Sequence, residues 1–127
     1  MIEKQIQELS LLTGPDYAAR RNAFLDQAPP LPDYPTGRPR VTVVHYEVAP
    51  HARLALHRHP VINAGMVLRG ELTVVADDGR ERSFRAGEGV IEMVGRLHYG
   101  ENRGEEPVEL VMVYAGSDGL PLSEPAE

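Results

Sequence analysis

Short apolar runs separated by turn residues make up the chain from Arg40 to Ala115. In order, the runs are VTVVHYEVA, ARLALHRH, GMVLRG, ELTVVA, RSFRA, GVIEMV, LHYGEN and VELVMVYA. Between two of them, Asp77-Asp78-Gly79 is typical of a tight hairpin, because glycine adopts the positive φ that such a turn requires. Short strands at close spacing are typical of antiparallel sandwiches and barrels. The pattern therefore predicts an all-β protein.

Several of these runs are apolar on both faces of the predicted strand. In VELVMVYA, Leu110 and Met112 alternate with Val111 and Val113. A free-standing antiparallel sheet usually has one face exposed to solvent, and that face is polar. Because these strands are apolar on both faces, both faces are expected to be covered. One face is expected to fill a barrel, and the other to be covered by the N-terminal segment, by a second subunit or by both. A homodimer is accordingly the expected form.

The first 35 residues differ in texture from the rest of the chain. Apolar residues recur there at helical spacing, and Thr13-Gly14-Pro15-Asp16 is typical of a helix N-terminus. A short helix is predicted from about Pro15 to Asp26, and the four prolines of APPLPDYP then favour an extended strap. The predicted units are a helical and extended arm over residues 1–35, a barrel over 36–116 and a C-terminal tail over 117–127.

Charge and cysteine content exclude several classes of protein. The 13 Lys and Arg are outnumbered by 19 Asp and Glu, and no basic run is present, so nucleic acid is not an expected partner. The N-terminus lacks the pattern of a secretory signal and no run of about 18 apolar residues occurs, so no membrane association is expected and a cytoplasmic location is predicted. Without cysteine, histidine and carboxylate are the strong metal ligands available.

Two histidines, His57 and His59, stand two positions apart in a predicted strand. Residues at i and i+2 of a strand project from the same face, about 6.5 to 7 Å apart, so both rings can converge on one ion. His98, which begins a later run, is a candidate for a third imidazole. A single buried histidine is more often a hydrogen-bonded core residue than a ligand, but the three together predict a site for a divalent transition metal ion.

Two stretches around these histidines resemble the paired motifs of the cupin superfamily. The first motif is H-x-H, three or four residues, Glu, six residues, Gly; the corresponding residues here are His57, His59, Asn63 and Gly70. The second is Gly, five residues, Pro-x-Gly, two residues, His, three residues, Asn; the corresponding residues here are Gly87, Met93, Gly95, His98 and Asn102. All spacings agree, and the departures are Asn63 for the acid and Met93 for the proline. The resemblance implies a small single-domain cupin with a jelly-roll β-barrel.

The resemblance also implies a ligand set of His57, His59 and His98, with Asn63 at the fourth position. Three neutral imidazoles with at most a weak amide carbonyl suit Zn²⁺, Fe²⁺, Ni²⁺ or Cu²⁺ better than Mn²⁺, which prefers carboxylate oxygen. Glu92 shares the face of its neighbours two positions away if the strand is regular. It is the candidate catalytic residue, as a substitute acid, metal ligand or general base; the alternative is a solvated carboxylate at a strand end.

The fold does not select a reaction, because single-barrel cupins include dioxygenases, isomerases, decarboxylases, lyases and binding domains. The predicted function is a metal-binding cupin that acts on a small organic molecule inside the barrel, with dioxygenase, isomerase or lyase chemistry. The alternative is a non-catalytic module that binds a metal or a small ligand. His45 and Glu47 are candidates to line the cavity, or to form a surface pair. Leu54 and Leu56 are candidates for the dimer interface.

Overall fold

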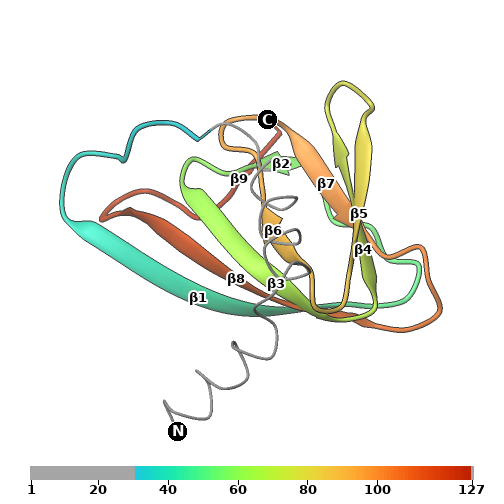
Figure 1. The fold of residues 1–127 in the computed structure, drawn as a ribbon. Helices are drawn as coiled ribbons and strands as arrows, with labels where there is room; N and C mark the ends of the chain where they lie inside the picture. The colour runs from blue at the N-terminus through green and yellow to red at the C-terminus, as the bar shows by residue number, and fades with distance from the viewer. Residues whose placement is uncertain (1–30, 127) are drawn as a thin grey trace, which may run out of the picture.

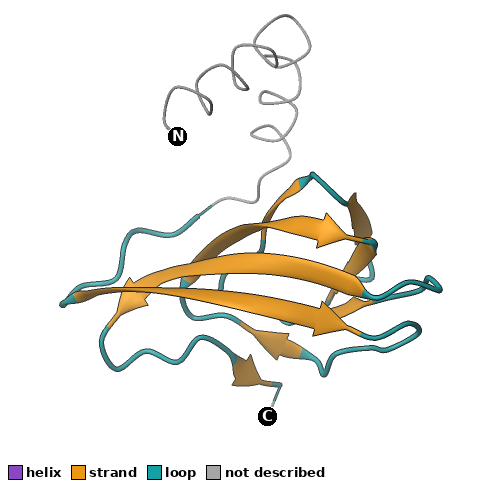
Figure 2. Ribbon diagram, turned by 90° about the horizontal axis from the view of Figure 1, so that it is seen from below, coloured by secondary structure: helices purple, strands orange, loops and turns teal. Residues whose placement is uncertain are grey.

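Residues 31–126 are described by the computed structural model, and they form a β-sandwich (Figure 1). This part of the chain contains strands and loops without a helix, so the prediction of an all-β fold is confirmed (Figure 2). The predicted helices fall within residues 1–30, outside the described residues. The strands are β1 (Pro39–Val48), β2 (His57–Arg58), β3 (Ile62–Arg69), β4 (Glu71–Ala76), β5 (Glu81–Arg85), β6 (Gly89–Ile91), β7 (His98–Glu101), β8 (Val108–Ser117) and β9 (Glu124–Pro125).

The strands form two sheets in the jelly-roll manner. The four-stranded sheet has the order β1-β8-β3-β6 and the five-stranded sheet the order β5-β4-β7-β2-β9, with antiparallel neighbours throughout. The predicted barrel needs one correction, because it is not closed: among the described strands, β5 is not paired with β6, nor β1 with β9. Each sheet has one short edge strand, β6 with three residues and β9 with two.

The core lies between the two sheets. The longest ladder joins β1 to β8 over ten pairs, from Pro39 with Ser117 to Val48 with Val108. Side chains alternate across each strand, so every second residue of this ladder turns inward. Each large apolar side chain buried in this way contributes about 1.5–3 kcal/mol of transfer free energy. The buried apolar residues are Val48, Val61, Val67, Leu72, Val75, Phe84, Val90, Val108, Leu110, Met112 and Tyr114.

A glycine in β3 lets the chain approach β8 closely. A Cβ at Gly65 would collide with the carbonyl oxygen of Val111 and lie 2.6 Å from Sδ of Met112. The Met112 side chain can move, but the carbonyl oxygen belongs to the ladder between β3 and β8 and cannot. The absence of a side chain at this position is therefore a requirement of the sheet.

Gly65→Ala is expected to lower the free energy of unfolding by roughly 1–3 kcal/mol, the usual cost of overpacking. Gly104→Ala is the matched control, because a Cβ there would meet only Oδ1 of Asn102, at an ordinary 3.4 Å. Urea denaturation of the two variants and the unmodified chain measures the difference. Equal stability of the two variants would contradict the close approach of β3 to β8.

The outer face of the four-stranded sheet carries exposed apolar side chains. Strand alternation places these residues on the face opposite the core. They are Val41, Val43, Met66, Leu68 and Val113. Within residues 31–126, no helix is long and apolar enough to cross a membrane.

Candidate metal centre

Strand pairing brings three histidines together. His57 of β2 is in register with His98 of β7, and His59 forms an isolated bridge to Val94. The two sequence motifs therefore meet in space, although about forty residues separate their histidines. One ligand atom from each of His57, His59 and His98 lies within 4.8 Å of the others. His59 and His98 are buried and His57 is half-buried, so this group could hold a metal ion.

Backbone carbonyls fix the orientation of all three rings. Nδ1 lies 2.6 Å from the oxygen of Ala55 in His57, 2.8 Å from that of Leu122 in His59 and 2.9 Å from that of Arg96 in His98. A carbonyl oxygen only accepts, so each Nδ1 carries the proton and donates it. In the neutral ring, Nε2 is then left with its lone pair. Ligand histidines in metal sites are oriented in the same way.

Two of these Nε2 atoms, those of His59 and His98, are buried without a hydrogen-bond partner among the described residues. An unsatisfied buried polar atom costs about 1–3 kcal/mol, so it requires an explanation. An ion bound by Nε2 would satisfy both atoms at once. The donor set thus fits a divalent transition metal, for which imidazole nitrogen is a common ligand.

Glu92 follows β6 and turns its carboxylate toward the histidines. Its Oε2 lies 2.8 Å from Nε2 of His59 and 3.5 Å from Nε2 of His98, and its side chain is only 13% exposed. The shorter contact is close in distance but lacks the alignment of a hydrogen bond. Two acceptor atoms at 2.8 Å repel unless a proton or a cation lies between them. Glu92 is therefore not the solvated strand-end carboxylate that the sequence allowed.

Charge and burial act against each other at these groups. Burial would raise the pKa of Glu92, but when a proton lies between its carboxylate and Nε2 of His59 or His98, hydrogen bonding and charge outweigh this effect and lower that pKa to about 2. Burial would lower the pKa of His98, but Glu92 reverses this effect and raises it. Burial lowers the pKa of His57. An ionised carboxylate thus faces imidazoles in a largely dehydrated place.

Asn63 is fully buried in β3, in register with Tyr114. Its Nδ2 donates to the carbonyl oxygen of Val61 over 3.3 Å. Its Oδ1 has no hydrogen-bond partner among the described residues. The amide position of the first motif therefore points into the interior, with an unpaired oxygen.

The family of the chain follows from a match over most of the sandwich. The family model described as Cupin domain matches residues 44–114, more than half of the 127 residues, and includes all three histidines. The chain belongs to the cupin family. A comparison of this cupin with curated proteins finds no match.

Solved structures that resemble this cupin include enzymes. An oxalate oxidase in complex with the substrate analogue glycolate is 28% identical, with a TM-score of 0.52, and the match covers 58% of this chain and 41% of that chain. A conserved protein with a double-stranded β-helix domain from Klebsiella pneumoniae subsp. pneumoniae is 26% identical, with a TM-score of 0.58, covering 80% of this chain and 94% of that chain. This cupin thus spans less than half of the oxalate oxidase that it matches.

A third solved structure shares the fold alone. A polyketide cyclase from Streptomyces resistomycificus is 21% identical, with a TM-score of 0.59, and the match covers 69% of this cupin and 61% of that chain. The oxalate oxidase and the polyketide cyclase thus share one fold. The fold of this cupin is therefore compatible with more than one reaction, and the choice depends on the residues around the site.

A cavity of about 450 Å³ lies beside the histidines of this cupin. His57, His59 and Glu92 line it together with valine, leucine and methionine side chains. Tyr46 and Tyr114 add polar atoms, with their hydroxyl oxygens 2.7 Å apart. Burial and the bond to Tyr46 raise the pKa of Tyr114, so its hydroxyl keeps its proton and can donate.

Strand alternation corrects one expectation about this cavity. His45 was a candidate cavity residue with Glu47, but it lies on the outer face, 3.4 Å from Glu109. Its neighbour Tyr46 turns inward instead, and no pattern in the sequence singled it out. Leu54 and Leu56 line the cavity and are also exposed, and their place in a dimer interface stays a prediction.

Other residues of the second motif support the site. Gly95 has a φ of 75°, and its N–H donates to the carbonyl oxygen of His59 over 2.9 Å. This turn therefore holds the segment before His98 against the first motif. Asn102 is buried and donates to the carbonyl oxygens of Val48 and Glu106 over 3.0 and 2.7 Å, a structural role.

Proposed function

We propose that this cupin is a metal-dependent enzyme that acts on a small organic molecule in the cavity beside His57, His59 and His98. The strongest support for this proposal is the pair of buried Nε2 atoms of His59 and His98, which have no hydrogen-bond partner among the described residues. The Nδ1 atoms of the same rings are fixed by backbone carbonyls. The cavity of about 450 Å³ is within the size range of small-molecule sites.

In this proposal the three histidines hold the ion. Glu92 completes the ligand set, because it supplies the carboxylate that the first motif has at the position of Asn63. The expected preference for Zn²⁺, Fe²⁺, Ni²⁺ or Cu²⁺ assumed that no carboxylate was close. A carboxylate oxygen 2.8 Å from Nε2 of His59 makes Mn²⁺ a further candidate, because Mn²⁺ favours oxygen ligands. When bound, a divalent ion supplies a Lewis acid that polarises an oxygen of the substrate.

The side chains of the cavity have roles that follow from their chemistry. If one oxygen of the Glu92 carboxylate binds the ion, the other is left to accept a proton from a substrate held beside it. The Tyr114 hydroxyl can donate a hydrogen bond that orients the substrate. The apolar wall formed by residues such as Leu110 and Met112 excludes water, which strengthens both interactions.

Metal analysis of protein purified without an affinity tag tests the proposal. We expect about one transition metal ion per chain by mass spectrometry, and oxygen consumption or product formation with members of a panel of phenols, diketones and short acids. A chain without metal in aerobic and anaerobic preparations would refute the proposal. Stoichiometric metal with tight ligand binding and no turnover would support the binding module.

The homodimer and the cytoplasmic location stay predictions. The exposed outer face of the four-stranded sheet, with Val43 and Val113 in register, supports the homodimer. Light scattering is expected to give twice the chain mass of 14.0 kDa, and Val43→Glu with Val113→Glu to halve that value. Glu47→Ala is the control, because Glu47 is an exposed residue of β1. Thr42→Glu would not serve as a control, because Thr42 turns toward the other face of the sheet. A monomer at high concentration would contradict the prediction.

A further inference from the structure

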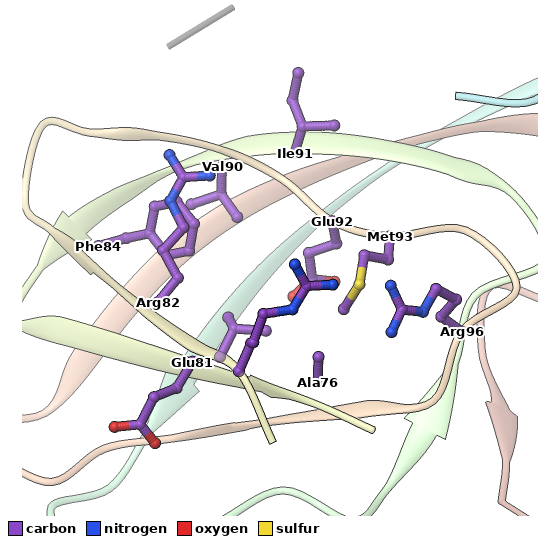
Figure 3. Close-up of a pocket in the computed structure, with 11 residues that line it drawn as sticks. Ala76, Glu81, Arg82, Phe84, Val90, Ile91, Glu92, Met93 and Arg96 are labelled. Carbon is purple, nitrogen blue, oxygen red and sulfur yellow. The ribbon is translucent and has the colours of Figure 1, made fainter. Parts of the chain in front are cut away.

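A second cavity, of about 320 Å³, lies where β5 and β6 leave the sandwich open. Its walls come from β4, β5, β6 and the segment that follows β6 (Figure 3). Glu92 lines this cavity and also the one beside the histidines. The two cavities therefore meet at one carboxylate, and the second is reached from a different edge of the sandwich.

The second cavity combines an apolar wall with three arginines. The apolar side chains are Val74, Ala76, Phe84, Val90, Ile91 and Met93. The arginines are Arg80, Arg82 and Arg96, and the acids that line the cavity are Glu81 and Glu92. Glu81 points away from the other lining side chains in Figure 3, and Arg103 binds its two oxygens over 2.9 and 2.8 Å. Among the residues that line this cavity, three arginines thus stand against two carboxylates, one of which is bound by Arg103.

Neighbouring carboxylates hold two of these arginines in place. Nη2 of Arg96 lies 2.6 Å from Oδ1 of Asp77, and Arg80 contacts Oδ2 of Asp78 through Nε at 2.8 Å and Nη2 at 2.7 Å. A guanidinium has five N–H donors, so these contacts leave each arginine able to donate further hydrogen bonds. A side chain already fixed loses less conformational entropy when it binds a ligand.

We propose that this second cavity binds a small organic anion, with its carboxylate at Arg80 and Arg96 and its apolar body against Phe84, Val90 and Met93. The charge of Glu92 at the junction orients the anion, because it repels a carboxylate and tolerates an apolar group. The planar guanidinium favours carboxylate over other oxygen groups, since it can donate two parallel hydrogen bonds. This site goes beyond the proposed function, and it does not require a metal ion.

Titration of the ¹⁵N-labelled full chain with benzoate, followed by amide chemical shifts, tests the proposal. Benzamide is the uncharged control of the same shape. We expect saturable shifts for benzoate in β5 and in the segment from Val90 to Arg96, and at least about tenfold weaker binding of benzamide, the usual scale of a hydrogen bond to a charged group. Shifts confined to residues near His57 and Tyr46 would place benzoate in the other cavity and overturn the proposal.

Single substitutions locate the charge that binds the anion. Arg96→Gln and Arg80→Gln are each expected to weaken benzoate binding several-fold, and together by roughly tenfold or more, since exposure limits each pair. Arg85→Gln is the matched control, because Arg85 is an exposed β5 arginine that pairs with Glu71 and does not line the cavity. Equal affinities in all variants, or an equal loss in Arg85→Gln, would overturn the proposal. Metal content, measured in parallel, tests the proposed function separately.

Discussion

His98→Ala is expected to abolish metal binding. His98 is fully buried, and its ring is oriented by the carbonyl oxygen of Arg96, so no other side chain can take its place without rearrangement of the β7 start. Loss of a residue that only orients a ligand already costs about 10- to 100-fold in affinity, and loss of a ligand costs more. His57→Ala and His59→Ala are expected to give the same result. The measurement is competitive metal loading followed by mass spectrometry.

Two histidines outside the site provide the matched controls. His45 and His51 are more than half exposed and lie 3.4 and 3.0 Å from Glu109 and Glu105. His45→Ala and His51→Ala are expected to keep the metal content of the unmodified chain. Circular dichroism of all five variants separates metal loss from unfolding. Retention of metal by a folded His98→Ala variant would contradict the three-histidine site.

The convergence of the three histidines was predictable in outline, because His57 and His98 lie on paired strands and His59 follows β2 directly. Residues two apart share a face of a strand, and the motif spacing placed His98 at the beginning of another strand. The jelly roll then needs only the register of His57 with His98 to bring the motifs together. This part of the site follows from local sequence pattern and from pairing.

The approach of Glu92 was less predictable, because β6 ends at Ile91. Glu92 thus lies in an irregular segment, where the alternation of a strand no longer predicts the direction of a side chain. The anchor of His59 was not predictable either. Leu122, whose carbonyl holds its ring, belongs to the predicted tail, which returns as β9 to pair with β2. A two-residue strand leaves no recognisable pattern in the sequence.

The inner face of β1 shows a different limit. Valines at both odd and even positions of this strand gave no preference for one face, and a shift by one residue exchanges the faces. His45 was therefore a candidate for the cavity or for a surface pair; the structure places Tyr46 in the cavity and His45 beside Glu109. The contact between Tyr46 and Tyr114 could not be predicted either, because it depends on the register of β1 with β8, which the sequence does not determine.

The remaining prediction concerns the position of the carboxylate ligand, which can stand at residue 92 or at residue 63. If Glu92 is the carboxylate ligand, at the place where the motif has an acid and this chain has Asn63, Glu92→Gln is expected to lower metal affinity by at least the roughly 10- to 100-fold that loss of an orienting residue costs. Asn63→Ala is expected to weaken metal binding only modestly, because an amide oxygen is a weak neutral ligand. Asn63→Glu is expected to raise the relative preference for Mn²⁺, since it adds carboxylate oxygen.

The double variant Asn63→Glu with Glu92→Gln gives the sharpest result. It moves the carboxylate from the segment after β6 to the buried β3 position, where Oδ1 of Asn63 has no hydrogen-bond partner among the described residues. We expect it to recover most of the metal affinity that Glu92→Gln loses, as measured by competitive loading of the unmodified chain, Glu92→Gln, Asn63→Glu and the double variant. Glu88→Gln is the control for loss of a carboxylate outside the cavities. If Asn63→Ala loses metal as completely as His98→Ala, the amide is itself a ligand, and Glu92 does not replace it.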